Sequence, residues 1–110
     1  MIIKRIKLPV YTGHLVLMKV DDFSEIPEKY KSDFDEKGFS ALMWCKADED
    51  DKNDFCIAFI DHPHGVIAHE SLHCVNSIFH ELHVEYTLMN DEHACYLLGW
   101  IVEQCYKFLE

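Results

Sequence analysis

The sequence predicts a small α+β domain in which one sheet of about four strands packs against helices. The chain has 110 residues, of which 49% are hydrophobic, and this is the size and composition of one compact domain spanning residues 1–110. Alternating or continuously apolar runs, typical of strands, dominate the first half of the chain. Apolar residues three or four positions apart, typical of helices, dominate the second half. The predicted element order is β-β-α-β-β-α-α.

Two strands and a helix are predicted first. Alternating apolar residues from Ile6 to Val10 indicate the first strand, and His14 to Val20 forms the second after a turn at residues 11–13. From Asp21 to Lys37, apolar residues at helical spacing predict a helix that Gly38 ends; they are Phe23, Ile26, Tyr30 and Phe34.

A second pair of strands follows. Residues 39–47 and 55–60 are predicted as strands, and the latter run is continuously apolar, which indicates a central strand covered on both faces. The acidic loop at residues 48–54 lacks the glycine and the final Glu of an EF-hand loop, so we expect a solvated hairpin tip rather than a calcium site.

The second half is predicted to form two helices. The first runs from about Val66 to His83, and the second begins after Asn90-Asp91 and runs to about Leu109. Gly99 is expected to mark a close approach of these helices.

Charge and composition exclude several classes of function. Ten Lys and Arg residues against twenty Asp and Glu residues leave a net charge of −10, which disfavours binding to nucleic acid or to an anionic membrane. No apolar run approaches the length of a membrane span. The five cysteines form no C-x-x-C pair, and with no secretion signal we expect a reducing cytoplasmic location.

One motif points to chemistry. Residues 69–73, His-Glu-Ser-Leu-His, fit H-E-x-x-H, in which both imidazoles lie on one helical face and can bind a single Zn²⁺. Glu70 is turned by about 100° and can reach a zinc-bound water. The opposite face of this helix is predicted to be buried; its residues are Ile67, Ala68, Ser71, Leu72, Cys74, Val75, Ile78, Phe79 and Leu82.

A catalytic zinc site needs a third protein ligand. Glu92 begins the next predicted helix, nineteen residues after His73, and is our candidate, with Asp91 and His93 as substitutes. The metal ligands predicted are thus His69, His73 and Glu92.

These residues resemble a known family. His69-Glu70-Ser71-Leu72-His73 followed by Asn90-Asp91-Glu92 is similar to the gluzincin branch of the zincin metallopeptidases, and residues 65–70 with 90–100 also resemble small zincin-like proteins encoded by bacteriophages. The resemblance implies a minimal zincin-like fold, Zn²⁺ on His69, His73 and Glu92, and Glu70 as the base. It also implies an edge strand that holds an extended peptide, and host cytoplasm as the location of a phage-encoded protein.

The chain departs from this family at two points. Thermolysin-type enzymes have Asp four residues after the glutamate ligand, where this chain has Tyr96, and the C-terminal domain that supplies their oxyanion-stabilising residue has no counterpart here. Tyr96 is our candidate for that role because it lies one turn beyond Glu92; His64, Tyr86 and His93 are alternatives.

Three functions follow from these predictions. The first is a zinc-dependent hydrolase, specifically a small metallopeptidase acting on an extended peptide. The second is a catalytically inactive zincin-derived domain that binds a protein, for example a phage factor acting on a host protein. The third is a structural zinc domain whose site is closed by His93 or Cys95.

Overall fold

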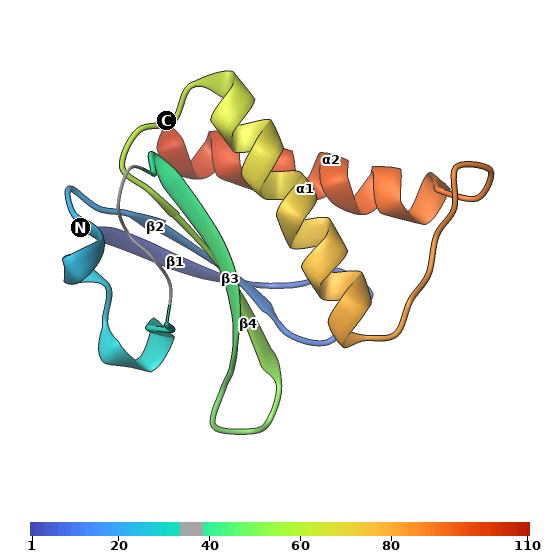
Figure 1. Cartoon of the computed structure of the whole chain (residues 1–110), viewed down its shortest axis with the longest axis horizontal. Helices are drawn as coiled ribbons and strands as arrows, with labels where there is room; N and C mark the ends of the chain where they lie inside the picture. Colours follow the sequence, from blue (N-terminus) through green and yellow to red (C-terminus); the bar gives the residue numbers. More distant parts are fainter. Residues whose placement is uncertain (34–38) are drawn as a thin grey trace.

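A computed structural model describes residues 1–33 and 39–110 and shows an α+β fold, as predicted (Figure 1). The described strands form one mixed sheet of four in the order β1-β2-β4-β3. Outer pairs are antiparallel, whereas the central pair, β2 and β4, is parallel. The strand bounds are Ile2–Lys7 (β1), His14–Lys19 (β2), Ala41–Ala47 (β3) and Asn53–Phe59 (β4).

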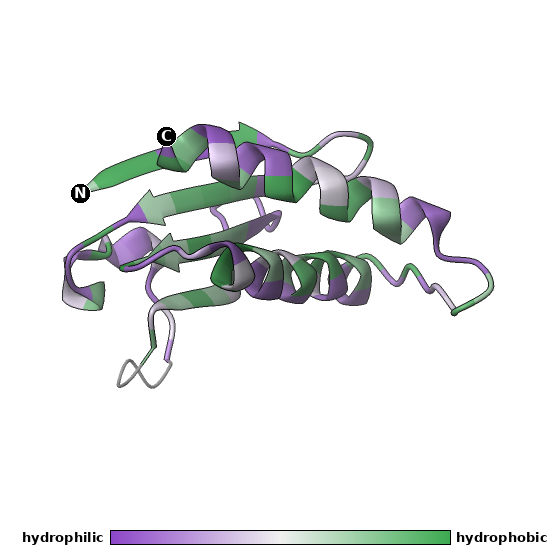
Figure 2. Cartoon of the chain, turned by 90° about the horizontal axis from the view of Figure 1, so that it is seen from above, coloured by the Kyte–Doolittle hydropathy of each residue, from purple (hydrophilic) through white to green (hydrophobic). Residues whose placement is uncertain are grey.

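Two long helices cover one face of this sheet. Helix α1 (His64–Glu81) lies over β3 and β4, and helix α2 (Glu92–Leu109) returns antiparallel to it, toward β2. Figure 2 shows apolar and polar residues alternating along both helices, as amphipathic helices on a sheet require. The core between them includes Leu15, Leu17, Phe55, Ile57, Phe59, Ile67, Cys74, Val75, Ile78, Leu97 and Ile101.

The other face of the sheet has its own apolar core. Side chains of alternate residues on β2 and β4 are covered there by the segment that follows β2; this core includes Val16, Met18, Cys56 and Ala58 with Phe23, Ile26 and Tyr30. Trp44 joins it and donates a hydrogen bond from Nε1 to the Tyr30 carbonyl at 2.6 Å. The prediction of a central strand covered on both faces is therefore confirmed for β4, whose residues 55–59 are all 0% exposed.

The predicted helix from Asp21 to Lys37 is wrong over the residues that the structure describes. Two short 3₁₀ turns, Phe23–Glu25 and Glu28–Tyr30, replace it. Asp22 accepts a hydrogen bond from the Ser24 amide, and Pro27 supplies no amide proton, so the turns do not join. The rest of the predicted helix, including Phe34 and its end at Gly38, lies in residues 34–38, outside the described residues.

Two smaller predictions also need correction. Strand β1 begins earlier than predicted, at Ile2, and Val10 stands 97% exposed in a turn with φ of 67°. Gly99 does not mark a close helix approach, because a Cβ atom built there would meet no atom of another described element within 4 Å.

Helices α1 and α2 are both too polar or too short to cross a membrane, and no other described helix qualifies.

Candidate functional site

The two histidines of the H-E-x-x-H motif meet on the solvent side of α1. Residues four apart in an α-helix lie one above the other, and the exposed rings of His69 and His73 make contact as that spacing predicts. Their Nε2 atoms are 3.1 Å apart, and their ring centroids are 4.7 Å apart.

This separation fits two positions of a tetrahedral zinc site. Two nitrogens bound at about 2.0–2.1 Å with a tetrahedral angle between them lie about 3.3–3.4 Å apart. The observed Nε2 separation of 3.1 Å is close to that value. In the absence of metal, the same separation suits a hydrogen bond between one protonated and one unprotonated ring nitrogen.

Glu70 lies between this pair and the sheet. The residue is only 8% exposed, although Ala68 and His69, which precede it in α1, are both exposed. Burial raises the pKa of its carboxyl group, and the charges of His69 and His73 oppose that shift.

Two adjoining hollows open beside these residues, between the first half of α1 and strand β3. They measure about 290 and 270 Å³, and His69, Glu70 and Phe39 line both. The first also contacts His73, Leu42 and Met43. Because β3 is an outer strand of the sheet, the hollows lie next to an edge with which no strand of the described residues pairs.

Glu92 does not join the histidine pair. Only one set of three His, Cys, Asp or Glu side chains in the described residues has ligand atoms within 4.8 Å of one another, and it excludes His69, His73 and Glu92. Asp91 and His93, the substitutes for Glu92, and Cys95 likewise belong to no such set of ligand atoms in the described residues.

The antiparallel arrangement of the helices explains why Glu92 lies apart from the histidine pair. The first turn of α2 faces the last turns of α1, where the His93 ring stacks on Phe79 at 5.3 Å. The last turns of α2 lie opposite the motif instead, with Cys105 contacting Ser71. The spacing in sequence predicted that Glu92 lies near His73. Helix α1 continues beyond His73 to Glu81 before the chain turns back, so Glu92 begins α2 at the far end of α1.

Tyr96 also lies apart from the motif. It is 77% exposed on α2 and lines neither hollow. The alternatives have other partners: His64 bonds Tyr106, Tyr86 donates to Asn76 at 2.7 Å, and His93 is 3.0 Å from the carbonyl oxygen of Glu85.

The buried face of α1 differs from the prediction at its edges. Ala68 and Leu72 were predicted to be buried, but both are exposed, and Leu72 retains 46% of its surface. Among the described elements, the sheet and α2 pack against one side of α1, so the buried arc is centred near Ile78 and extends to Glu70 rather than to Leu72.

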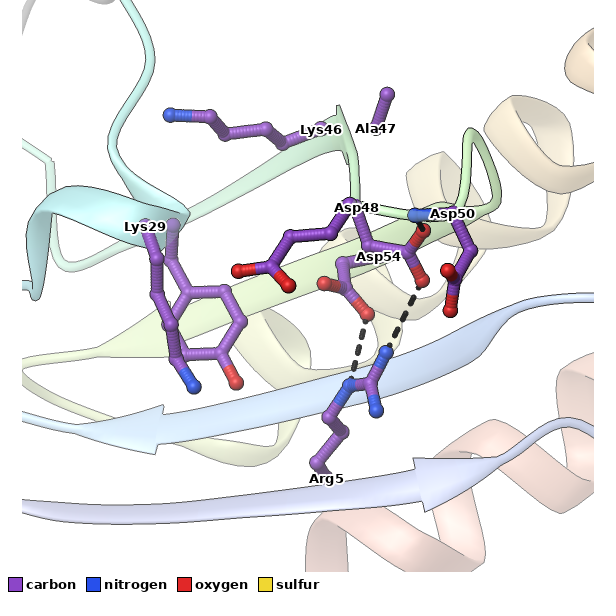
Figure 3. Close-up of a pocket in the computed structure, with 9 residues that line it drawn as sticks. Arg5, Lys29, Lys46, Ala47, Asp48, Asp50 and Asp54 are labelled. Carbon is purple, nitrogen blue, oxygen red and sulfur yellow. Dashed lines mark hydrogen bonds and ion pairs between the residues drawn. The ribbon is translucent and has the colours of Figure 1, made fainter.

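The one metal-ligand group that the structure assembles in its described residues was not predicted. It comprises His14, Asp48 and Asp54, and Arg5 forms ion pairs with both carboxylates, at 3.2 Å to Asp48 and 3.0 Å to Asp54 (Figure 3). Asp48 and Asp54 stand at the two ends of the acidic loop that we expected to be a solvated hairpin tip. The signal in the sequence was this pair of carboxylates at the loop ends, but their histidine partner comes from a strand some forty residues earlier.

Electrostatics hold this group together. Burial opposes ionisation of Asp48, but the amides of Lys52 and Asp50, and then Arg5 and His14, outweigh it and lower the pKa of Asp48. Burial likewise tends to lower the pKa of Arg5, but the hydrogen bond and charge of Asp54 outweigh it and raise that pKa.

No family model matches the chain, and no curated protein or solved structure is significantly similar to it.

Proposed function

We propose that the chain is a zinc-dependent hydrolase, a small metallopeptidase whose site is built on His69, Glu70 and His73. The observation that carries the proposal is the 3.1 Å separation of the two Nε2 atoms, beside a glutamate that lines the adjoining hollows. Because no third His, Cys, Asp or Glu side chain among residues 1–33 and 39–110 joins the pair, we expect zinc to bind more weakly than at a site with three protein ligands.

Each residue has a distinct role in this proposal. Zinc, when bound, lowers the pKa of water and polarises a scissile carbonyl. His69 and His73 hold the metal through their Nε2 atoms. Glu70 takes the proton from the attacking water and delivers it to the leaving amine, which is the task of a general base and then of a general acid.

Strand β3 is the proposed binding surface for the substrate. Its outer edge has no strand partner in the described sheet, and the hollows beside Glu70 border its residues Leu42 and Met43. An extended peptide that pairs with this edge would pass the motif. Such a substrate needs no deep cleft, which suits a chain of 110 residues.

A second candidate is a protein-binding domain without catalysis. The absence of Glu92 from the histidine pair favours it, because the free edge of β3 can bind a peptide whether or not a metal is present. The structural zinc alternative has less support, since neither His93 nor Cys95 completes the pair.

A cleavage assay separates the two candidates. The purified protein is incubated with ZnCl₂ and a degenerate peptide library, and new N-termini are identified by mass spectrometry. We expect cleavage by the wild type and a loss of about 10²–10⁴-fold in Glu70→Gln, the range for removal of a general base. Glu81→Gln, an exposed glutamate on the same helix, is the matched control and should cleave at the wild-type rate.

Two results would refute the hydrolase. One is a wild type that produces no cleavage with zinc present, which leaves the binding domain as the better candidate. The other is cleavage that persists in Glu70→Gln, which would assign the activity to a contaminant or to another site.

We propose a reducing cytoplasm as the location. All five cysteines are free thiols, and three of them, Cys56, Cys74 and Cys105, are buried in the core. Buried thiols of this kind pack as small apolar side chains and need no oxidising compartment.

A further inference from the structure

The group formed by His14, Asp48 and Asp54 lies on the face of the sheet opposite the two helices. His14 and Asp54 are register partners on the parallel strands β2 and β4, so their side chains stand side by side on one face. Two residues further along, Val16 and Cys56 occupy that same face and belong to the core away from α1 and α2. The group is therefore separated from the H-E-x-x-H motif by the sheet itself.

The third member comes from the β3–β4 hairpin. Asp48 follows β3 directly and is fixed by its own loop, because its Oδ1 accepts hydrogen bonds from the amides of Asp50 and Lys52 at 2.8 and 2.9 Å. One ligand atom from each of the three side chains lies within 4.8 Å of the other two. The three donors come from two paired strands and from a loop that its own hydrogen bonds hold in place, so the site is largely preformed.

One ring nitrogen of the histidine in this group is buried and lacks a partner in the described part of the chain. The Nδ1 atom of His14 is buried and makes no hydrogen bond with any described residue. Buried polar atoms in proteins are nearly always satisfied, and an exception calls for an explanation such as an ion. A neutral imidazole has one unprotonated nitrogen, and that nitrogen is a common metal ligand.

A cationic side chain already bridges the carboxylates. The Arg5 guanidinium contacts Asp48 through Nη2 and Asp54 through Nε, and Figure 3 shows both carboxylates directed at it. Asp54 is only 5% exposed, whereas the Arg5 side chain is 39% exposed and can move into solvent. Arg5 thus stands where a positive charge is favoured and where a metal would compete with it.

We propose that His14, Asp48 and Asp54 form a second metal site, which binds a divalent first-row transition cation such as Zn²⁺ in exchange for the Arg5 guanidinium. The donor set of one imidazole nitrogen and two carboxylate oxygens suits Zn²⁺, Fe²⁺ or Mn²⁺, whereas Ca²⁺ and Mg²⁺ prefer oxygen alone. The adjoining cavity of about 490 Å³, lined by Asp48, Asp54 and Arg5, leaves room for water in the remaining positions.

The test is made in a variant that lacks the other candidate site. In His69→Ala/His73→Ala, titration with ZnCl₂ by calorimetry should show one equivalent bound, which millimolar MgCl₂ does not displace. Adding His14→Gln, or Asp48→Asn in a separate variant, should weaken zinc binding by at least about tenfold. Even loss of a residue that only hydrogen-bonds a metal ligand typically lowers metal affinity by about 10–100-fold. Adding His80→Gln, an exposed histidine on α1, is the matched control and should change nothing.

Arg5→Gln tests the exchange itself. Removal of the competing guanidinium should tighten zinc binding. Absence of saturable binding in the double variant, or binding that survives both His14→Gln and Asp48→Asn, would overturn the second site. Unchanged or weaker binding in Arg5→Gln would overturn the exchange. Circular dichroism of each variant checks that a lost affinity is not a lost fold. Since the double variant lacks His69 and His73, its result is independent of the proposed hydrolase.

Discussion

Gly13→Ala should destabilise the domain strongly, because Gly13 adopts a conformation and a position that no other residue suits. Its φ is 110°, and a Cβ atom there would lie 2.7 Å from the Asn53 carbonyl oxygen and 3.2 Å from a ring carbon of Phe55. The glycine ends the β1–β2 turn directly before His14 and lies against the start of β4. Alanine would therefore strain the backbone and push β2 and β4 apart.

The expected cost follows from these two effects. A non-glycine residue in a disfavoured backbone region costs about 1–3 kcal/mol, and forcing an extra methyl group into a packed site costs about 1–3 kcal/mol. Their sum is about 2–6 kcal/mol. With an unfolding entropy of about 2.1 cal/mol/K per residue, each kcal/mol shifts the Tm of a chain this size by about 4 °C. The expected decrease in Tm is therefore about 8–25 °C.

The assay is thermal unfolding followed by circular dichroism, with Gly99→Ala as the control. Gly99 lies inside α2, and a Cβ atom there would touch nothing within 4 Å, so alanine should stabilise the protein by about 0.5–1 kcal/mol. A Gly13→Ala protein that melts within about 2 °C of the wild type would refute the described packing between the β1–β2 turn and β4.

Two further predictions concern α1. In the absence of metal, Glu70→Gln should be more stable than the wild type near pH 7, because burial raises the pKa of Glu70 and the folded state then binds its proton more tightly than the unfolded state does. The unfolding free energy of the wild type should fall as the pH rises from the unfolded pKa of about 4.3 through the folded value. Urea unfolding with EDTA should show equal unfolding free energies for the two proteins below this pH range. A less stable Glu70→Gln at pH 7 would contradict the burial of this carboxylate. Ile78→Ala, at a fully buried position, should cost about 2–5 kcal/mol, whereas Leu72→Ala, at a position 46% exposed, should cost less than about 1 kcal/mol; equal losses in urea unfolding would contradict the orientation of the helix.

Local patterns in the sequence were enough to predict most of the fold. The continuous apolar run at residues 55–60 identified β4 as the central strand, because only a strand covered on both faces tolerates such a run. Helical spacing placed α1 and α2 within about two residues of their observed bounds. The same spacing failed for Phe23, Ile26 and Tyr30, which cover the second face of the sheet from 3₁₀ turns around Pro27 rather than from a helix.

For the candidate sites too, the sequence predicts contacts within one helix but not contacts between elements that are distant in the chain. The contact between His69 and His73 depends only on the pitch of one helix, so the sequence was sufficient to predict it. The position of Glu92 depends on where α2 crosses α1, which residue counting does not specify. The pairing of His14 with Asp54 depends on the register of two parallel strands forty residues apart in the chain, and no local pattern encodes that register.

Zinc content tests the proposed motif most directly. The untagged wild type, His73→Ala, Glu70→Gln and the control His80→Ala are each dialysed to equilibrium against the same free zinc concentration, and the protein-bound excess of zinc is measured by plasma mass spectrometry. We predict that His73→Ala binds one zinc per chain fewer than the wild type, while Glu70→Gln and His80→Ala bind as much as the wild type. Equal zinc in His73→Ala and the wild type would contradict a metal at this pair and reduce the 3.1 Å contact to a hydrogen bond on a polar helix face.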